Sequence, residues 1–428
     1  MPQNDQARDV QRVDVVDLDI TNVAHGGVFV ARHEGRVVFV PDTMPGERIR
    51  ARITDRKHDS FWRAETLEVI EAAPERQEHV WSAASIERAP DARAGGAEFG
   101  HIRLPYQREL KRQVLVDALQ RMAKLESDVT VEPVDDETAD GTGWRTRVRL
   151  QVARDGEFGP YAARTHNVVP ATDLPLATAL VGETVPFGQT FPGAESIDVI
   201  ATSTGAAHVL VNEPPVKRGK RTVRPRHRPM PIREVVGDRE FQLDVRGFWQ
   251  VHRRAAATLT EAVQSAVDEA LFDPRAANLD LYGGVGLLAA ALGDRFGSTL
   301  RITSVESDEA ATDNAAENLA EWLGASAVTD RVERFVTRLA ADSSATDRSR
   351  LRAATVVLDP PRSGAGRPVV DALASLEPAQ IVYVACDPVA LARDVALFAE
   401  RGYGLRTLRA FDLFPNTHHV EAVATLTR

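Results

Sequence analysis

The segment "LDLYGGVGLL" at residues 279–288 gives the strongest indication of the fold, because an apolar strand runs through a glycine-rich turn into a helix. Glycines in such a turn let a ligand approach the backbone at the carboxyl edge of a parallel sheet. A tight strand-to-helix turn needs glycine in any case, so the motif alone leaves the ligand open. The G-x-G-x-x-G spacing of dinucleotide-binding turns is missing, which disfavours a nicotinamide cofactor.

The sequence on either side of this segment alternates between strands and helices. Helical patterns separate nearly all-apolar strands, which are expected at 276–282, 300–307, 353–359 and 380–385. This alternation predicts a doubly wound, mainly parallel α/β sheet. Glu306 ends the second of these strands, where a carboxylate is suited to binding both ribose hydroxyls of a nucleoside. The turn and Glu306 together indicate a nucleoside-bearing cofactor that needs no pyrophosphate, such as S-adenosylmethionine.

Two further strands end in side chains that suit catalysis. In "VVLDPPRSG", Asp359 ends a buried strand, and two prolines stiffen the loop that follows. In "IVYVACDPVALARD", the next strand ends at Cys386, the single cysteine of the chain. Asp387 and Pro388 are typical of a helix N-cap and first turn, so we expect the helix dipole to favour the thiolate of Cys386. A small buried hydrophobe is the commoner fate of a lone cysteine.

The N-terminal part of the chain is rich in short strands. Five strand patterns between residues 11 and 72, separated by glycine and proline, predict a small closed β-barrel. A helix is expected over 104–125, because apolar residues recur every four positions from Leu110 to Met122. Strand patterns return from about 143 to 245. We therefore expect a barrel, a β-rich central domain and a C-terminal α/β domain.

The composition limits the classes of function. The 428 residues carry a formal net charge of −10, which argues mildly against a nucleic-acid partner unless a basic patch is local. One cysteine excludes an internal disulfide, an iron–sulfur cluster and a multi-cysteine zinc site. No apolar run reaches the ~18 residues of a membrane span and no secretion signal is evident, so we expect a cytoplasmic protein that does not enter membranes.

A cysteine beside a methyl donor has a specific use in pyrimidine chemistry. Carbon 5 of a pyrimidine is a weak nucleophile, but addition of a thiolate to carbon 6 turns the ring into an enolate whose carbon 5 can attack a methyl sulfonium. A base then removes the proton on carbon 5, and the thiolate is expelled. The scheme combines covalent with general-base catalysis and requires one cysteine, one base and a cofactor held between them.

Over nearly the whole chain, these motifs resemble the S-adenosylmethionine-dependent RNA 5-methyluridine methyltransferases that carry an N-terminal TRAM barrel. "AHGG" followed by "GRVVFVP" is similar to that barrel, and "LPYQRELKRQVLVDAL" to the helix before the central domain. "GFWQVH", "LDLYGGVGLL", "DPPRSG", "YVACDPVALARD" and "FPNTHHVEAVATL" resemble the family's catalytic motifs in order. The resemblance implies that Cys386 is the nucleophile, Glu421 the base and Arg362 a substrate contact. It implies cofactor contacts by Gln250, Tyr282, Gly283, Glu306 and Asp359.

The resemblance also divides the chain into domains. It assigns 11–72 to the TRAM barrel, 73–103 and 127–244 to the β-rich central domain, and 104–126 with 245–428 to the methyltransferase domain. Many TRAM-bearing members hold an iron–sulfur cluster on four cysteines before the helix, but the corresponding stretch "WSAASIERAPDARAGGAEFGHI" contains none. We therefore expect a cluster-free variant with S-adenosylmethionine as cofactor and no metal ion.

A basic segment supplies the positive charge that the whole chain lacks. "VKRGKRTVRPRHRPMPIRE" at 216–234 holds eight Lys or Arg residues and no acid before its final glutamate. We expect it to contact the RNA backbone, and a solvated loop is the alternative. The substrate contacts that we assign here are Arg218, Arg221, Arg224 and Arg226.

Several alternatives remain open. By analogy with the family, ribosomal RNA is the expected substrate, with transfer RNA as the alternative. A 5-methylcytosine enzyme of similar type generally uses two cysteines, and an amino-group methyltransferase would have an aromatic residue where Arg362 stands. A catalytically inactive protein that binds S-adenosylmethionine and RNA is a third hypothesis. We expect the protein to be a monomer.

Overall fold

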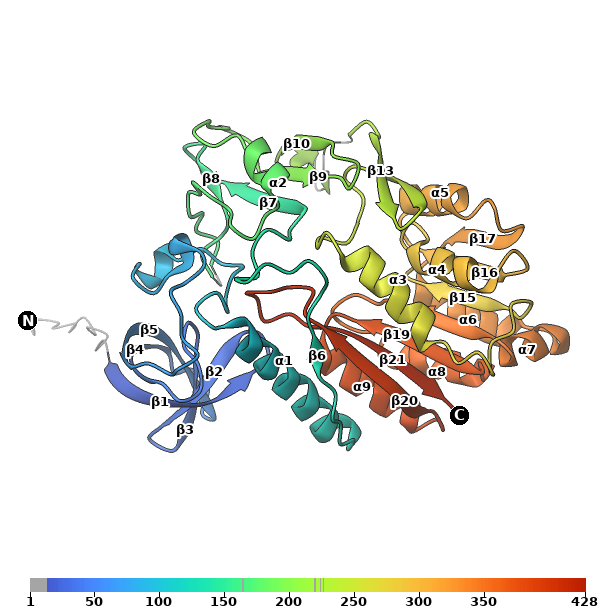
Figure 1. Ribbon diagram of the computed structural model, residues 1–428, viewed down its shortest axis with the longest axis horizontal. Helices are drawn as coiled ribbons and strands as arrows, with labels where there is room; N and C mark the ends of the chain where they lie inside the picture. The colour runs from blue at the N-terminus through green and yellow to red at the C-terminus, as the bar shows by residue number, and fades with distance from the viewer. Residues whose placement is uncertain (1–13, 164, 219–220, 224, 226) are drawn as a thin grey trace, which may run out of the picture.

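The computed structural model describes residues 14–163, 165–218, 221–223, 225 and 227–428. Its elements form three regions: an N-terminal barrel, a β-rich region and a large C-terminal α/β sheet (Figure 1). Within the described residues, no helix combines the length and the apolar character needed to cross a membrane.

The N-terminal region is a closed five-stranded barrel in the order β1-β2-β3-β5-β4. Alternate side chains point inward along these strands, and Leu18, Phe29 and Ile49 are fully buried in its interior. This confirms the small barrel predicted from the strand spacing. The strands are β1 (Val15–Ala24), β2 (Val28–His33), β3 (Arg36–Val40), β4 (Arg48–Asp55) and β5 (Phe61–Glu71).

A single helix, α1 (Leu104–Ala118), joins the barrel to the large sheet. Leu110 belongs to the core of the barrel, whereas Leu115 packs into the core of the large sheet. The predicted helix was expected to continue to 125, but it changes into a π-helical turn, η3 (Leu119–Ala123). The wider turn rotates the following side chains, so Met122 is exposed although the four-residue spacing placed it on the buried face.

The central region contains a four-stranded sheet and two hairpins. The sheet has the order β10-β9-β7-β8, and the helix α2 (Ala179–Thr184) packs on it. Phe241 and Leu243 of the second hairpin pack into the C-terminal core, which Ile200 and Leu210 of the four-stranded sheet also join. The strands of the sheet are β7 (Arg147–Val152), β8 (Phe158–Gly159), β9 (Ser196–Ala201) and β10 (Ala207–Asn212). The first hairpin consists of β11 (Val216–Arg218) and β12 (Arg221–Val223), and the second of β13 (Pro231–Val236) and β14 (Arg239–Asp244).

The C-terminal region is an eight-stranded sheet in the order β17-β16-β15-β18-β19-β21-β20-β6. The strands from β17 to β19 are parallel, and β21 runs antiparallel between β19 and β20. This confirms the doubly wound, mainly parallel sheet. The short β6 pairs with β20, so residues 131 and 132 form the last strand of this sheet. The strands are β15 (Asn278–Leu281), β16 (Arg301–Glu306), β17 (Gly324–Thr329), β18 (Thr355–Leu358), β19 (Gln380–Ala385), β20 (Gly404–Phe411), β21 (Glu421–Thr427) and β6 (Val131–Glu132).

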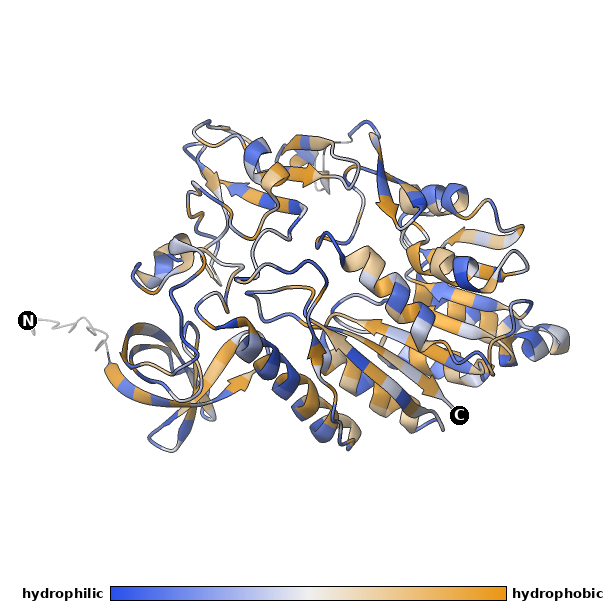
Figure 2. Cartoon of the chain, in the orientation of Figure 1, coloured by the Kyte–Doolittle hydropathy of each residue, from blue (hydrophilic) through white to orange (hydrophobic). Residues whose placement is uncertain are grey.

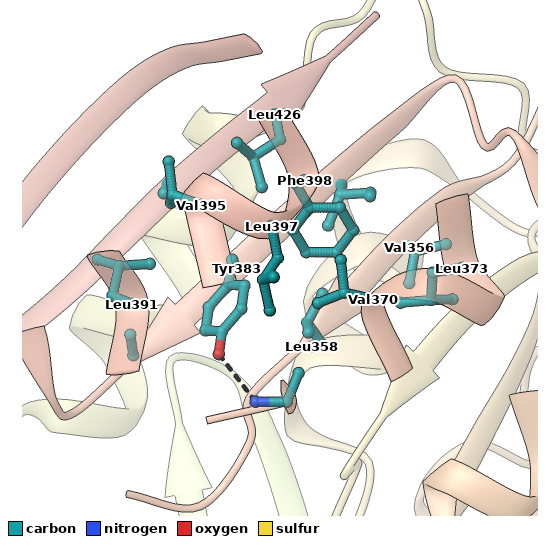
Figure 3. Close-up of a cluster of buried hydrophobic side chains, with 14 of the residues drawn as sticks. Val356, Leu358, Val370, Leu373, Tyr383, Leu391, Val395, Leu397, Phe398 and Leu426 are labelled. Atoms are coloured by element: carbon teal, nitrogen blue, oxygen red, sulfur yellow. Dashed lines mark hydrogen bonds between the residues drawn. The ribbon is translucent and has the colours of Figure 1, made fainter. Parts of the chain in front are cut away.

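Helices cover both faces of this sheet, which is why its strands are apolar on both sides (Figure 2). On one face, Leu358 and Tyr383 pack with Val370 and Phe398 (Figure 3). The Tyr383 hydroxyl donates to Asp394 and accepts from a backbone N–H, so its polar end is satisfied. Burying each such side chain contributes roughly 1.5–3 kcal/mol. The helices are α3 (Ala255–Ala266), α4 (Leu287–Phe296) and α5 (Glu309–Asn318) on one face, and α6 (Val332–Asp342), α7 (Ala345–Arg352), α8 (Gly366–Leu376) and α9 (Pro388–Ala399) on the other.

Candidate active site

The candidate site lies at the carboxyl edge of the parallel strands. Parallel strands deliver their ends to one edge of a sheet, so the residues after β15, β16, β18 and β19 meet there. Because β21 runs antiparallel, its first residue, Glu421, reaches the same edge, and Ala422 pairs with Ala385 next to Cys386. The edge borders a cavity of about 1090 Å³. Among its lining residues are Gln250, Tyr282, Gly284, Glu306, Asp359, Arg362, Cys386, His419 and Glu421.

The glycine-rich turn after β15 forms one wall of this cavity. Tyr282 adopts a left-handed backbone (φ +62°), a conformation that costs a non-glycine residue about 1–2 kcal/mol. Gly284 is left-handed as well (φ +55°), and nothing lies within 4 Å of the position that a Cβ would take there. Such an open backbone lets a ligand approach closely.

Gly283, by contrast, was expected at the cofactor and is not among the residues that line the cavity. A Cβ at this position would meet the Ser304 hydroxyl at 2.0 Å and Asp280 at 2.6 Å. Glycine is therefore required here by packing against the neighbouring strand. The adjacent Gly284 borders the cavity in its place.

Glu306 ties the end of β16 to the glycine-rich turn. One carboxylate oxygen accepts from the backbone N–H groups of Ser307 and Asp308, and the other accepts from Gly284 N at 3.3 Å. These bonds orient the carboxylate at the wall of the cavity. Oε2, which accepts the single bond from Gly284 N, retains capacity to accept from a ribose hydroxyl. The open turn, the carboxylate and the size of the cavity fit a nucleoside-bearing cofactor.

Cys386 lies at the end of β19, directly before Asp387, the N-cap of α9. Its side chain is partly buried in the cavity wall. Burial, Glu421 and Asp359 raise the pKa of the thiol to about 12, and Arg362 opposes this change. The pKa of the thiol therefore moves opposite to the direction expected from the helix dipole, and burial is the main cause.

The carboxyl groups around Cys386 share the same environment. Glu421 is 3% exposed. Burial and the nearby Asp359 raise the pKa of Glu421 well above its usual value, while Arg362 lowers it. Burial and Asp280 raise the pKa of Asp359 to about 7. Both acids therefore hold protons more tightly than exposed carboxyls, and a positive charge placed between them would favour their ionised forms.

Arg362 connects the site to the loop before β21. Its guanidinium follows the Asp-Pro-Pro segment and is a donor to His419 Nε2 at 3.2 Å. Burial and nearby cationic groups lower the pKa of His419 to about 3, which leaves this imidazole neutral and able to accept. His419 thus lines the cavity beside Arg362. Within the described part of the chain, no group of three or more His, Cys, Asp or Glu residues is arranged to hold a metal ion.

The structure brings most of the predicted site residues together. Seven of them line the one cavity: Cys386, Glu421, Gln250, Tyr282, Glu306, Asp359 and Arg362. The backbones of Arg218 and Arg221 pair in the β11–β12 hairpin, and Arg224 and Arg226 lie outside the described residues. Sequence reasoning missed Arg145 and Phe248, which also line the cavity. Phe248 is 72% exposed and lies inside the segment "GFWQVH", whereas nothing near Arg145 marks it as a site residue.

Comparisons with known proteins agree with this geometry. Residues 237–428 match the tRNA (Uracil-5-)-methyltransferase family, and residues 8–61 match the TRAM domain. An RNA methyltransferase of Streptomyces avermitilis is 36% identical over 96% of this chain and 97% of its own length. An RNA methyltransferase of Bifidobacterium longum is 32% identical over the full length of both chains.

A solved structure extends the likeness to three dimensions. The tRNA (uracil-54, C5)-methyltransferase of Pyrococcus abyssi, in complex with S-adenosyl-L-homocysteine, aligns with a TM-score of 0.67. The alignment covers 96% of this chain and 100% of that one at 21% identity, which shows a shared fold. On its barrel, its sheet and its full-length relatives, the chain belongs to the TRAM-domain family of S-adenosylmethionine-dependent RNA (uracil-5-)-methyltransferases.

Proposed function

We propose that this protein methylates carbon 5 of a specific uridine in RNA through a covalent adduct with Cys386. The supporting observation is that Cys386 and Glu421, which stand at adjacent ends of β19 and β21, border the same cavity as the glycine-rich turn. The proposal places a uracil ring in that cavity with carbon 6 toward the sulfur and carbon 5 toward the carboxylate. Asp359 and Arg362 lie beside both groups.

The chain's residues would act in two steps. Sγ of Cys386 bonds to carbon 6 after losing its proton, and the electron pair of the carbon 5–carbon 6 double bond gives carbon 5 the nucleophilicity to take a methyl group. The carboxylate of Glu421 then removes the hydrogen on carbon 5 as a proton, the double bond re-forms, and Sγ leaves carbon 6 with its bonding pair. These are nucleophilic and general-base roles.

Both roles require ionised groups, whereas burial and the neighbouring carboxyl groups favour the protonated forms. When bound, S-adenosylmethionine supplies the methyl group and a sulfonium charge, and a positive charge in this cavity favours a thiolate and a carboxylate. Arg362 already acts in this direction on both Cys386 and Glu421. Its position on the Asp-Pro-Pro loop would let it contact the substrate as well.

RNA would be held outside the cavity by two surfaces. The TRAM barrel is one, and the basic segment that contains Arg218, Arg221, Arg224 and Arg226 is the other. Ribosomal RNA is the substrate that we propose, by analogy within the family. Transfer RNA is the second candidate, because the structurally similar Pyrococcus abyssi protein is named as a tRNA enzyme.

The deciding experiment maps 5-methyluridine in ribosomal and transfer RNA from cells with and without the gene. Loss of one 5-methyluridine from ribosomal RNA is the expected result, and loss from transfer RNA alone would replace the first substrate by the second. Unchanged 5-methyluridine in both, with S-adenosylmethionine still bound by the purified protein, would favour the inactive binding protein.

The domain boundaries, the cytoplasmic location and the monomeric state remain predictions.

A further inference from the structure

A second cavity of about 220 Å³ adjoins Cys386 on the side of the barrel. The turn between β1 and β2, residues 24–27, forms one of its walls. Cys386, Arg362 and His419 line this cavity as well as the larger one. The candidate nucleophile is therefore bordered by the methyltransferase domain on one side and by the barrel on the other.

His25, at the tip of that turn, contacts the segment that carries Cys386. Its Nε2 lies 2.8 Å from Oδ2 of Asp387, a residue 362 positions later in the chain. Oδ1 of Asp387 accepts from Val389 N at 3.0 Å and from Ala390 N at 2.8 Å, which caps α9. The two oxygens of one carboxylate thus fix the start of the helix and bind the barrel.

A second contact holds the same turn in place. Gly27 has a left-handed backbone (φ +71°), and a Cβ there would come within 2.9–3.0 Å of the His418 ring. The turn therefore lies directly against the loop that leads to Glu421. The β1–β2 ladder pairs Ala24 with Val28 at the base of this turn, so His25 and Gly27 lie beyond the paired strands.

We propose that His25 is a positioning residue of the methyl-transfer site, and that the barrel turn completes that site by holding the Cys386–Asp387 segment. The inference rests on the proposed role of Cys386 as nucleophile. Through this positioning role of His25, the barrel sets the direction in which the sulfur meets carbon 6, in addition to its expected contact with RNA. Asp387 carries the constraint, since its peptide follows Cys386 directly.

The charges around His25 set the pH range of this contact. The hydrogen bond to Asp387 raises the pKa of His25, and burial opposes the rise. The imidazolium is thus retained to a higher pH than in an ordinary histidine, and its ion pair with Asp387 weakens as the pH rises through that raised pKa. The other charged or titratable groups that line the cavity are Cys386 on the same segment, Lys111 from α1, Arg362 after β18, and His418 and His419 before β21.

The test compares matched variants of the full-length protein. His25→Ala removes the contact, and His25→Gln keeps a neutral N–H donor that can reach Asp387. Asp387→Asn keeps the cap through its amide oxygen but removes the charge. His33→Ala, at the opposite turn of the same barrel, is the control. The measurements are kcat and KM for RNA, the rate of adduct formation with 5-fluorouridine RNA, and the pKa of His25 by NMR.

We expect His25→Ala to lower kcat and the adduct rate at saturating RNA by about tenfold, because small misplacements of an attacking group cost up to ~100-fold. His25→Gln should recover most of that loss, and His33→Ala should show none. Asp387→Asn should lower the pKa of His25, because both influences that raise it come from Asp387 and burial acts in the opposite direction. A His25→Ala variant with wild-type kcat and adduct rate, or with a change in KM alone, would overturn the inference.

The design separates this inference from the proposed function. If the wild-type protein forms no adduct and no 5-methyluridine, the role of Cys386 fails, and the positioning role of His25 falls with it. If the wild-type protein is active and the His25 variants match it, only the present inference fails. If His25→Ala does not fold, the kcat and adduct rate of His25→Gln and Asp387→Asn test the inference in its place. An unshifted His25 pKa in the wild-type protein would count against the contact with Asp387.

Discussion

Replacing Glu421 by Gln should separate the two halves of the proposed reaction. The amide has nearly the shape of the carboxyl group, and the side chain is almost fully buried, so the fold should tolerate the change. The carboxyl of Glu421 contributes to the raised pKa of its neighbour Cys386. The amide removes that contribution, so the thiol should ionise more readily and the first half of the reaction should not slow.

The second half should slow severely. General-base catalysis contributes about 10²–10⁴ in rate, which corresponds to roughly 3–5.5 kcal/mol of activation free energy. Glu421→Gln should therefore transfer one methyl group per active site and then remain linked to RNA through Cys386. Denaturing gels of radiolabelled RNA report the adduct, and a rapid-quench time course reports the single burst. Steady turnover at the wild-type rate, without accumulation of adduct, would refute the assignment of Glu421 as the base.

A stability measurement provides an independent check. The pKa of Glu421 is raised in the folded protein, so this group binds its proton more tightly there than in the unfolded chain. The wild-type protein should therefore lose stability as the pH rises from about 4.5, the ordinary glutamate pKa, up to the folded value. Glu421→Gln should remove this decline, so its stability relative to the wild type should grow with pH. Urea unfolding at several pH values measures the difference.

Other predictions address the nucleophile, RNA binding and the core. Cys386→Ala should abolish methyl transfer and the adduct with 5-fluorouridine RNA, while S-adenosylmethionine binding measured by calorimetry stays near the wild-type value. Lys111→Met should destabilise the fold by about 3 kcal/mol in urea unfolding, because it strips one partner from a fully buried ion pair with Asp412. A quadruple variant with serine at four arginine positions should show a weaker salt dependence of RNA binding, with a slope smaller by roughly 0.7 for each phosphate that the protein no longer neutralises. The cofactor's Kd should stay unchanged. The four positions are Arg218, Arg221, Arg224 and Arg226.

The architecture could be predicted because it follows from local patterns. Apolar strands that end in Tyr282, Glu306, Asp359 and Cys386 share one edge whenever the sheet is parallel, so their meeting needed no tertiary information. Glu421 is different, since it reaches that edge through an antiparallel strand inserted beside β19. Only the family resemblance placed it at the site.

The electrostatics of the site could not be predicted in the same way. The raised pKa of Cys386 depends on the burial of the thiol and on carboxyl groups brought in by two other strands. The need for glycine at position 283 depends on the close approach of the Ser304 and Asp280 side chains. The exposure of Met122 depends on a π-helical turn, which the spacing of the apolar residues does not predict. Each outcome required the packed structure.

The helix α1 makes the molecule less modular than its three regions suggest. Leu110 completes the interior of the barrel, and Leu115, little more than one turn further on, completes the interior of the sheet. Each buried leucine contributes roughly 1.5–3 kcal/mol, so melting of either region would leave the other with an exposed apolar seam. The barrel and the sheet should therefore denature as one cooperative unit. A recombination event or a truncation that separates them at this helix would yield two incomplete halves rather than two independent proteins.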